Sequence, residues 1–320
     1  MILDLLAYGT FFLATALTYA IVCLGLNLQW GQTGLFNVGV AGFVAVGAYA
    51  SALLTTPPAA GRYGGYGLPI LIGWAGAMIA AGAVAWLVGK ITLRLRTDYL
   101  AITTFGVATV IQLVALNDQS LTGGPFGIGF IPRPFAGLAE QIFLYDLIHL
   151  AVVVVVLVIV YVALERLVAS PWGRVLRAIR EDEEAAVSLG KNADSLRLQA
   201  FVLGCALMGL AGALQAHFIA FIAPENYLPA LTFQVWAMLI IGGSGNNKGA
   251  ILGAIVVWAL WSLSGSAISA LVPADMQARA ASVRIVAVGL ALVAVLLWRP
   301  RGLLVERQAI SRHLTAGMKP

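Results

Sequence analysis

Residues 143–164 read FLYDLIHLAVVVVVLVIVYVAL. An α-helix rises about 1.5 Å per residue and the hydrocarbon core of a bilayer is about 30 Å thick, so a helical span needs about 20 mostly apolar residues. This stretch has that length, and no Asp, Glu, Lys or Arg follows Asp146 within it. It predicts a helix that crosses a membrane.

The whole chain has a composition that fits this stretch. Of its 320 residues, 61% are hydrophobic and 10% are charged, against about 45–50% and about 25% in soluble domains. The mean hydropathy is +0.93. The two cysteines, Cys23 and Cys205, lie inside apolar segments, so we interpret them as small packing residues rather than as a disulfide. The net charge of +5 comes with no run that mixes basic and aromatic residues, which argues against a nucleic-acid-binding protein.

Similar apolar segments along the chain predict an all-α fold, a polytopic membrane helical bundle of about nine spans, with a range of about eight to ten. Residues 1–320 then form a single transmembrane domain. The first segment lacks the positively charged start of a cleaved signal peptide, so we interpret it as a retained span. The candidate spans are residues 5–28, 35–54, 68–93, 99–116, 143–164, 198–219, 231–241, 250–272 and 283–298.

Lysine and arginine are distributed unequally between the two sides of this topology. Of the 19 such residues, only Arg62, Arg133, Arg279 and Arg284 fall on one side, and the rest fall on the other. The positive-inside rule places the richer side in the cytoplasm. The C-terminus, with a tail over residues 300–320, is then cytoplasmic, and the N-terminus lies outside.

The second span has the least regular start. Residues 30–37 read WGQTGLFN and place two glycines among polar side chains. Residues 31–54 are therefore either broken or re-entrant, lining a substrate path, or they begin with residues that cap a helix at the cytoplasmic surface. Polar side chains in or beside the spans could line a path, or could equally form hydrogen bonds between helices. They are Asn27, Gln29, Gln32, Asn37, Thr103, Thr104, Gln112 and Gln234.

The longest polar interruption is the predicted cytoplasmic loop of residues 166–196. Ser170 and Pro171 suit the N-cap and the first position of a helix, and residues 174–180, RVLRAIR, form an amphipathic pattern too short to span a bilayer. Four acids at 181–184 suit the start of a second helix, which Gly190 would end. An anionic lipid surface would attract the arginines but repel the acids, so a protein partner is predicted.

Several segments carry a resemblance to a known family. Glu184, Ala185, Ala186 and Gly190 follow the spacing E-A-A-x-x-x-G, which resembles the loop by which ABC importer permeases dock on their ATPase. The chain also resembles the LivM-type permeases of branched-chain amino-acid importers in DYLAI at 98–102, LTGGP at 121–125, RVLRAIRE at 174–181, GGSG at 242–245 and RPRGL at 299–303. It departs from the family where AFVL at 200–203 replaces the usual I-x-L-P, and at Asn246 and Ala250 in the glycine-rich turn.

The resemblance implies a permease subunit in the bacterial inner membrane that forms a path for branched-chain amino acids with a second homologous permease. A periplasmic binding protein would deliver the substrate. ATP and Mg would be bound by partner ATPase subunits, with no cofactor and no metal on this chain. The implied ATPase-coupling residues, within the loop 166–196, are Arg174, Arg177, Arg180, Glu184, Ala185, Ala186 and Gly190.

Other functions are weighed against this one. The chain has no G-x-x-x-x-G-K-[ST] segment for holding ATP and no nucleophile or metal-ligand pattern of a membrane enzyme, so no catalytic residue is predicted. The alternatives are a permease of the same family for urea, short amides or small sugars, and an ion-coupled secondary transporter. An ion-coupled transporter usually carries an ionisable residue near the bilayer centre, whereas Asp98, Asp146, His149 and His217 lie near the ends of spans.

Overall fold

The computed structural model describes residues 2–271 except 59, 60, 96, 136 and 138–141, and beyond them residue 273, scattered residues from 283 to 299, and 302–306. Its α-helices are α1 (Ile2–Thr33), α2 (Val40–Thr55), α3 (Ile70–Thr92), α4 (Thr97–Asn117), α5 (Gln119–Thr122), α6 (Ile142–Ala169), α7 (Pro171–Glu181), α8 (Glu183–Ser188), α9 (Ala193–Ile219), α10 (Pro229–Gly242) and α11 (Asn247–Leu271). The short strands β1 (Ile128–Gly129) and β2 (Phe221–Ile222) and the 3-10 turns η1 (Gly124–Phe126) and η3 (Pro224–Tyr227) lie between them.

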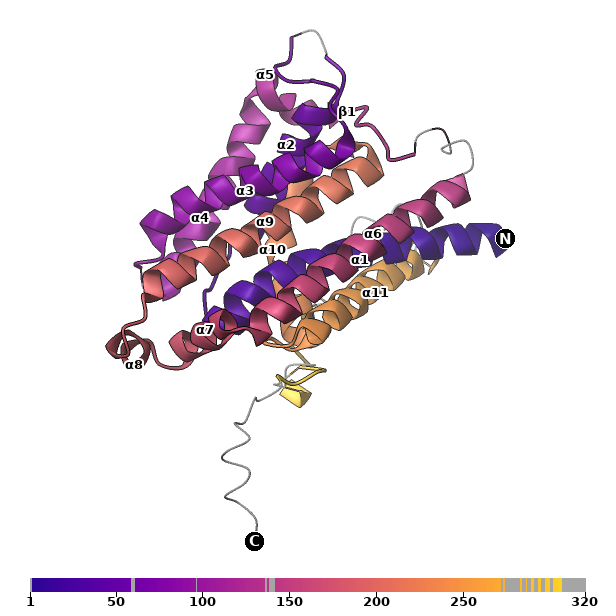
Figure 1. Cartoon of the computed structure of the whole chain (residues 1–320). Coiled ribbons are helices and arrows are strands. Elements are labelled where there is room, and N and C mark those ends of the chain that lie inside the picture. The colour runs from indigo at the N-terminus through magenta and orange to yellow at the C-terminus, as the bar shows by residue number, and fades with distance from the viewer. Residues whose placement is uncertain are drawn as a thin grey trace.

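The long helices pack around a central pair, α1 and α9. In the most apolar stretch of each helix, 78% of the α1 residues and 72% of the α9 residues are buried. In the other long helices of the described part, the buried share is 28% or less. Helices α6 and α11 pack on α1, whereas α2 and α3 pack on α9, and α4 packs on α2 (Figure 1). Fully buried side chains such as Leu24, Phe43, Phe201 and Met208 fill the space between these helices.

Small residues allow α2 and α9 to approach closely. A Cβ atom on Gly47 would lie 2.2 Å from the Cα atom of Gly209, and one on Gly212 would lie 2.1 Å from the carbonyl oxygen of Val44. No side chain fits at such a distance, so the glycines permit backbone contact between the two helices, as is common in membrane bundles. The high glycine content of the chain therefore has a packing role at this contact.

The predicted spans agree with the fold over most of the chain. Six described helices, α1, α3, α4, α6, α9 and α11, are long and apolar enough to cross a membrane, and α2 and α10 are shorter apolar helices. Helix α1 runs to Thr33, residues 34–39 are not helical, and α2 begins at Val40, so the irregular start of the segment 31–54 lies between two helices. Most of the ninth candidate span, 283–298, and most of the tail 300–320 lie outside the described residues.

The connection between α4 and α6 covers one end of the bundle, named here the α5 end. Strands β1 and β2 pair antiparallel there, with Ile128 opposite Ile222. Asp118 caps α5: its Oδ1 accepts hydrogen bonds from the Ser120 hydroxyl at 2.6 Å and from the amide of Leu121 at 3.1 Å. These bonds lower the pKa of the Asp118 carboxyl below its usual value. Helices α7 and α8 lie at the opposite end, named the α7 end (Figure 1).

Candidate functional site

Two short helices at the α7 end connect α6 to α9, as predicted from the loop 166–196. Ser170 and Pro171 occupy the N-cap and first position of α7. Asp182 ends α7 and caps α8, because its Oδ1 accepts the amide N–H of Ala185 at 2.9 Å. Gly190, with φ +76°, turns the chain after α8. This left-handed backbone conformation favours glycine, which agrees with its predicted role as a helix end.

The inner side of α7 is fixed to the bundle by buried apolar side chains. Leu176 and Ile179 are both buried, and Ile179 packs with Ala186 of α8 and Ala193 of α9 in a small cluster. Arg197 Nη1 binds Glu183 Oε1 at 2.6 Å, which ties α9 to α8. The two helices therefore form one unit with the start of α9.

The three arginines of α7 have different surroundings. Arg174 is exposed, and its Nη1 donates to the carbonyl oxygen of Ala169 at 3.2 Å. Arg177 Nη1 donates to Gln32 Oε1 at 3.4 Å. Arg180 donates to the carbonyl oxygen of Gly31. Arg177 and Arg180 thus bind the end of α1 in their own chain, and of the three only Arg174 extends into solvent.

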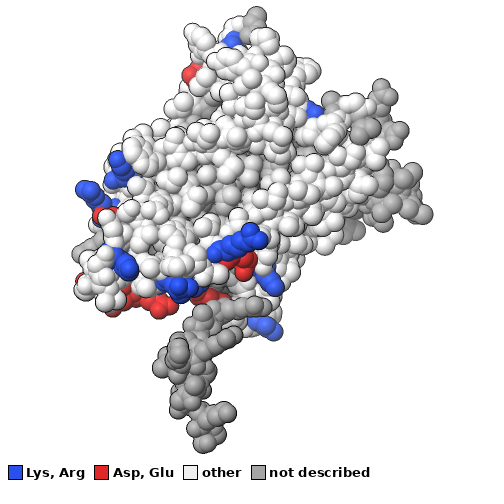
Figure 2. Space-filling view, viewed as in Figure 1, with Lys and Arg blue, Asp and Glu red and all other residues white. Residues whose placement is uncertain are grey.

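The outer side of α7 and α8 is exposed and mixes charged with apolar residues. Leu189 exposes 80% of its surface and Val187 exposes 51%. Charged side chains gather over this end in Figure 2, whereas the middle of the visible face is almost free of them. Apolar side chains held in water beside charges are typical of a protein-binding surface. We name it the α7–α8 surface and define it as Arg174, Ala178, Glu181, Glu184, Ala185, Val187, Leu189 and Gly190.

The α1–α2 break, residues 34–39, is held by buried polar side chains from several helices. Asn37 Nδ2 donates to Gln29 Oε1 at 2.9 Å, and Asn37 Oδ1 accepts the amide of Gly39 at 2.7 Å. The hydroxyl of Thr104 on α4 accepts the amide of Val38 at 3.0 Å. The structure therefore brings Gln29, Asn37 and Thr104 together, each fully buried, as partners for backbone that lacks helical hydrogen bonds.

Helix α10 contributes two more partners to this break. The Thr232 hydroxyl accepts the amide of Ala41 at 3.0 Å, and Trp236 Nε1 donates to the carbonyl oxygen of Asn37 at 2.9 Å. The Trp236 ring also packs against Phe36 and Trp30, with centroids 4.7 and 5.4 Å away. The break is thus a packed junction of α1, α2, α4 and α10.

The last turns of α1 bind the turn between α10 and α11. Asn27 Nδ2 donates to Asn247 Oδ1 at 2.8 Å, and Asn27 Oδ1 accepts the amide of Gly245 at 2.8 Å. Asn247 Nδ2 in turn donates to Glu165 Oε1 of α6 at 3.0 Å. Gln32 Nε2 donates to the carbonyl oxygen of Gly245 at 3.2 Å. Asn27 and Gln32 therefore bind other parts of the chain near the α7 end.

The remaining path candidates lie apart from this cluster. The Thr103 hydroxyl donates to the carbonyl oxygen of Tyr99 within α4, and Gln112 lies half-buried further along the same helix. Gln234 of α10 lines a cavity of about 510 Å³ between α1, η3, α10 and α11, and its Nε2 has no hydrogen-bond partner among the described residues. Gln234 is therefore a predicted path residue with a buried amide nitrogen, unpaired within the described part, beside a cavity.

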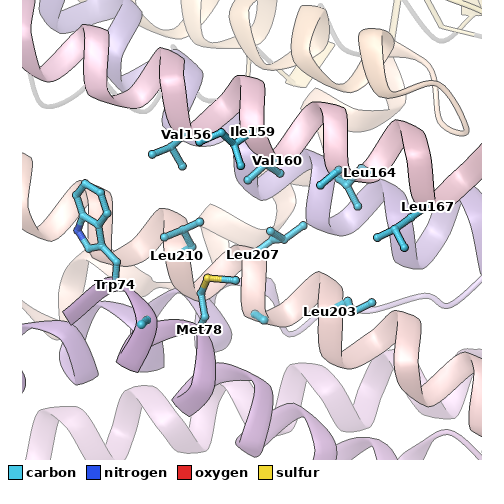
Figure 3. A pocket seen from close by; sticks show the side chains of 13 residues that line it. Trp74, Met78, Val156, Ile159, Val160, Leu164, Leu167, Leu203, Leu207 and Leu210 are labelled. Carbon is cyan, nitrogen blue, oxygen red and sulfur yellow. The ribbon is translucent and has the colours of Figure 1, made fainter. Parts of the chain in front are cut away.

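A second cavity, of about 450 Å³, is a groove between α6 on one side and α3 and α9 on the other (Figure 3). Val156, Val160 and Leu164 of α6 face Met78 of α3 and Leu207 of α9 across it. Among the described residues, its lining is apolar except for the indole N–H of Trp74 and has no charged group to pair with the ends of an amino acid. This groove does not suit a polar substrate.

The two histidines considered for ion coupling are placed near the α5 end. His217 Nε2 lies 2.9 Å from the Ser51 hydroxyl oxygen, and its Nδ1 lies 2.7 Å from the carbonyl oxygen of Pro132. The His149 ring stacks on Phe218, with centroids 4.1 Å apart. Both nitrogens of His217 are thus engaged in holding α9 to α2 and to the loop after β1, which is a structural role.

Several residues of these contacts were not predicted from the sequence. Thr232 and Trp236 stand in a short apolar helix without a local signal, while Glu165 and Asn247 are partners 82 positions apart. Glu306 contacts Arg180 from a tail that has no periodic pattern. The sequence pattern that pointed to the contact residues was a polar residue inside an apolar run. This pattern identified Asn27, Gln29 and Asn37.

This chain is similar to known permease components of branched-chain amino acid transport systems. A family model described as "Branched-chain amino acid transport system / permease component" matches residues 9–297. The chain is 35% identical over 323 residues to the high-affinity branched-chain amino acid transport system permease protein LivM of Escherichia coli strain K12, covering 92% of this chain and 70% of that protein. It is 26% identical over 259 residues to the corresponding permease protein LivH of Salmonella typhimurium strain LT2, covering 79% and 83%. No solved structure is significantly similar to it.

Proposed function

Because the chain belongs to the family of branched-chain amino acid permease components, we propose that it is one of two permease subunits of an ATP-binding-cassette importer in a bacterial inner membrane. The observation that carries the proposal is the α7–α8 surface. It is exposed, it combines charged with apolar side chains, and it lies at one end of a bundle of apolar helices long enough to cross a membrane. An ATPase subunit that docks there would supply the energy that this chain has no ATP-binding segment to supply.

Sidedness follows from the same proposal. The α7 end faces the cytoplasm, in agreement with the positive-inside rule, and the α5 end faces the periplasm. Phe126 and Phe130, with 82% and 93% of their surface exposed, lie at the α5 end. They are suitable contacts for a binding protein that delivers the substrate.

A second permease subunit is supported by the relatives. Escherichia coli strain K12 has both a LivM and a LivH permease protein for branched-chain amino acids, and this chain is 35% and 25% identical to them. Two similar permeases side by side would enclose a path that neither encloses alone. A zwitterionic amino acid with an apolar side chain suits a bundle with few fixed charges inside its helices.

The test is reconstitution of this chain in lipid vesicles with the second permease, ATPase and binding protein encoded by neighbouring genes. We expect ATP-dependent uptake of labelled leucine, isoleucine and valine, each competing with the others, and none when the ATPase lacks its phosphate-binding lysine. Uptake driven by a proton gradient without ATP would instead support an ion-coupled transporter. Uptake of urea or acetamide but not of leucine would overturn the substrate assignment.

A further inference from the structure

Arg180 joins three segments that are far apart in the sequence. Its guanidinium donates to the Gly31 carbonyl oxygen in the last turns of α1, and its Nη2 lies 3.0 Å from Glu306 Oε1 near the C-terminus. The side chains of Arg180 and Glu306 expose only 23% and 30% of their surface. A planar guanidinium can bind a carbonyl and a carboxylate together in fixed directions.

The place where Arg180 meets α1 is the start of the α1–α2 break. Gly34, with φ +71°, is the first residue of the break. A Cβ atom on Gly34 would lie 3.3 Å from the Cγ atom of Arg180, so the arginine side chain passes directly over this glycine. Arg177 adds a parallel contact one turn earlier through Gln32. Helix α7 is thereby bound to the point where α1 stops.

Glu306 is itself held by the turn between α10 and α11. The amides of Leu303 and Leu304 donate to the carbonyl oxygens of Ile241 and Gly242 at 2.8 and 3.0 Å. Asn246 Nδ2 donates to the carbonyl oxygen of Val305 at 3.1 Å. These bonds fix the segment 302–306 along the end of α10, so its carboxylate is presented to Arg180 from a defined position.

We propose that Arg180 and Glu306 form a positioning latch, which transmits movement of the α7–α8 surface to the α1–α2 break. The proposal rests on the proposed function, in which an ATPase moves that surface. When α7 is displaced, the Arg180 guanidinium pulls the Gly31 carbonyl and with it the end of α1. The α1–α2 break, which contains Asn37, then moves together with the end of α1. Glu306 keeps the guanidinium in the orientation in which the pull reaches α1.

The experiment compares Glu306→Gln with Asp194→Asn in the complete complex in lipid. Asp194 is an exposed carboxylate in the first turn of α9 and lies outside the α7–α8 surface, so it is a matched control for a general change of charge. For Glu306→Gln we expect the rate of substrate-stimulated ATP hydrolysis to fall about fivefold. This loss lies between that typical of removing an exposed ion pair and that typical of removing a buried hydrogen bond to a charged group. Glu306→Asp should recover most of the rate, and Asp194→Asn should leave it unchanged.

A double-mutant cycle tests whether the two residues act as one unit. Arg180→Gln with Glu306→Gln should be no worse than Arg180→Gln alone, while copurification of the ATPase with each variant checks assembly. A full rate of stimulated hydrolysis for Glu306→Gln, or an equal loss for Asp194→Asn, would overturn the latch.

A measurement on the permease without its partners separates this inference from the proposed function. The amides of Gly34 and Leu35 donate to the carbonyl oxygens of Trp30 and Gln29 at 2.9 and 3.0 Å. In Glu306→Gln we expect these two amides to exchange with deuterium about fivefold faster, because Arg180 no longer holds the end of α1. Unchanged exchange would overturn the latch even if the chain transports no amino acid, and faster exchange without ATP-driven transport would overturn only the proposed function.

Discussion

Asn37 shows how a single side chain stabilises irregular backbone inside a membrane protein. It binds Gln29 and the amide of Gly39, and it is fully buried. In hydrocarbon or in a packed interior, an unpaired polar group costs far more than it does in water. The residue therefore determines where the chain can leave helical geometry between α1 and α2.

Replacing Asn37 with leucine should destabilise the protein. The substitution leaves Gln29 Oε1 without its donor and the Gly39 N–H without its acceptor in a buried site, which costs about 1–3 kcal/mol for each unsatisfied group. Thermal unfolding in lipid nanodiscs should show a clearly lower midpoint. Thr103→Ala is the control, because that hydroxyl bonds only within its own helix, and its midpoint should stay close to the wild-type value. Equal midpoints for the two variants would contradict the role of Asn37.

At the scale of the element, α8 is too short to be stable alone. It has six residues, whereas isolated helices shorter than about 12–15 residues are marginal in water. The Asp182 cap and the burial of Ala186 against Ile179 and Ala193 therefore decide whether it forms.

Asp182→Ala should weaken α8 by about 1 kcal/mol, the usual cost of losing an N-cap side chain. If the α7–α8 surface docks an ATPase, substrate-stimulated hydrolysis by the reconstituted complex should fall with it. Asp182→Asn keeps an acceptor for the Ala185 amide and should retain the rate. A loss that is the same in both variants would show that the negative charge, rather than the cap, is what the partner requires.

The contact between α2 and α9 makes a second prediction at this scale. Gly47→Ala places a Cβ atom 2.2 Å from Gly209, so the helices must separate, at a cost of about 1–3 kcal/mol for overpacking. Gly106→Ala on α4 meets nothing within 4 Å and should be neutral or slightly stabilising. The two variants should differ in their unfolding midpoints in the same lipid. If both variants have the wild-type unfolding midpoint, α2 and α9 do not approach each other as closely as described.

At the scale of the whole molecule, the proposed sidedness can be read by labelling single cysteines. Cys23 and Cys205 are fully buried, so the native background should be low. A membrane-impermeant maleimide added to intact spheroplasts should label Phe126→Cys at the α5 end and spare Leu189→Cys at the α7 end. Inverted membrane vesicles should give the opposite pattern. Labelling of Leu189→Cys in intact spheroplasts would reverse the orientation.

The sequence predicts the long helices well and the site only partly, for a physical reason. Apolar length and helix-capping residues are local, so the described long helices and the two helices of the loop 166–196 could be found in advance. The partners of Asn37 and Val38 are not local: Trp236 is 199 positions from Asn37, and Thr104 is 66 from Val38. The amphipathic pattern of α7 likewise predicts a helix, but no pattern connects Arg180 to Gly31 and Glu306, which it contacts.

The groove between α6 on one side and α3 and α9 on the other affects the conditions under which this protein can be compared with its variants. An apolar volume of about 450 Å³ that opens at the side of the bundle cannot hold water at low cost, and its walls lose dispersion contacts if it stays empty. Apolar groups from outside the described residues, either acyl chains of the lipid or side chains of a neighbouring subunit, are therefore expected to fill it and to complete the packing of α6. Purification that removes these groups should loosen α6, the helix that leads directly into α7, so stability and coupling should be compared in the complete complex at one fixed lipid composition.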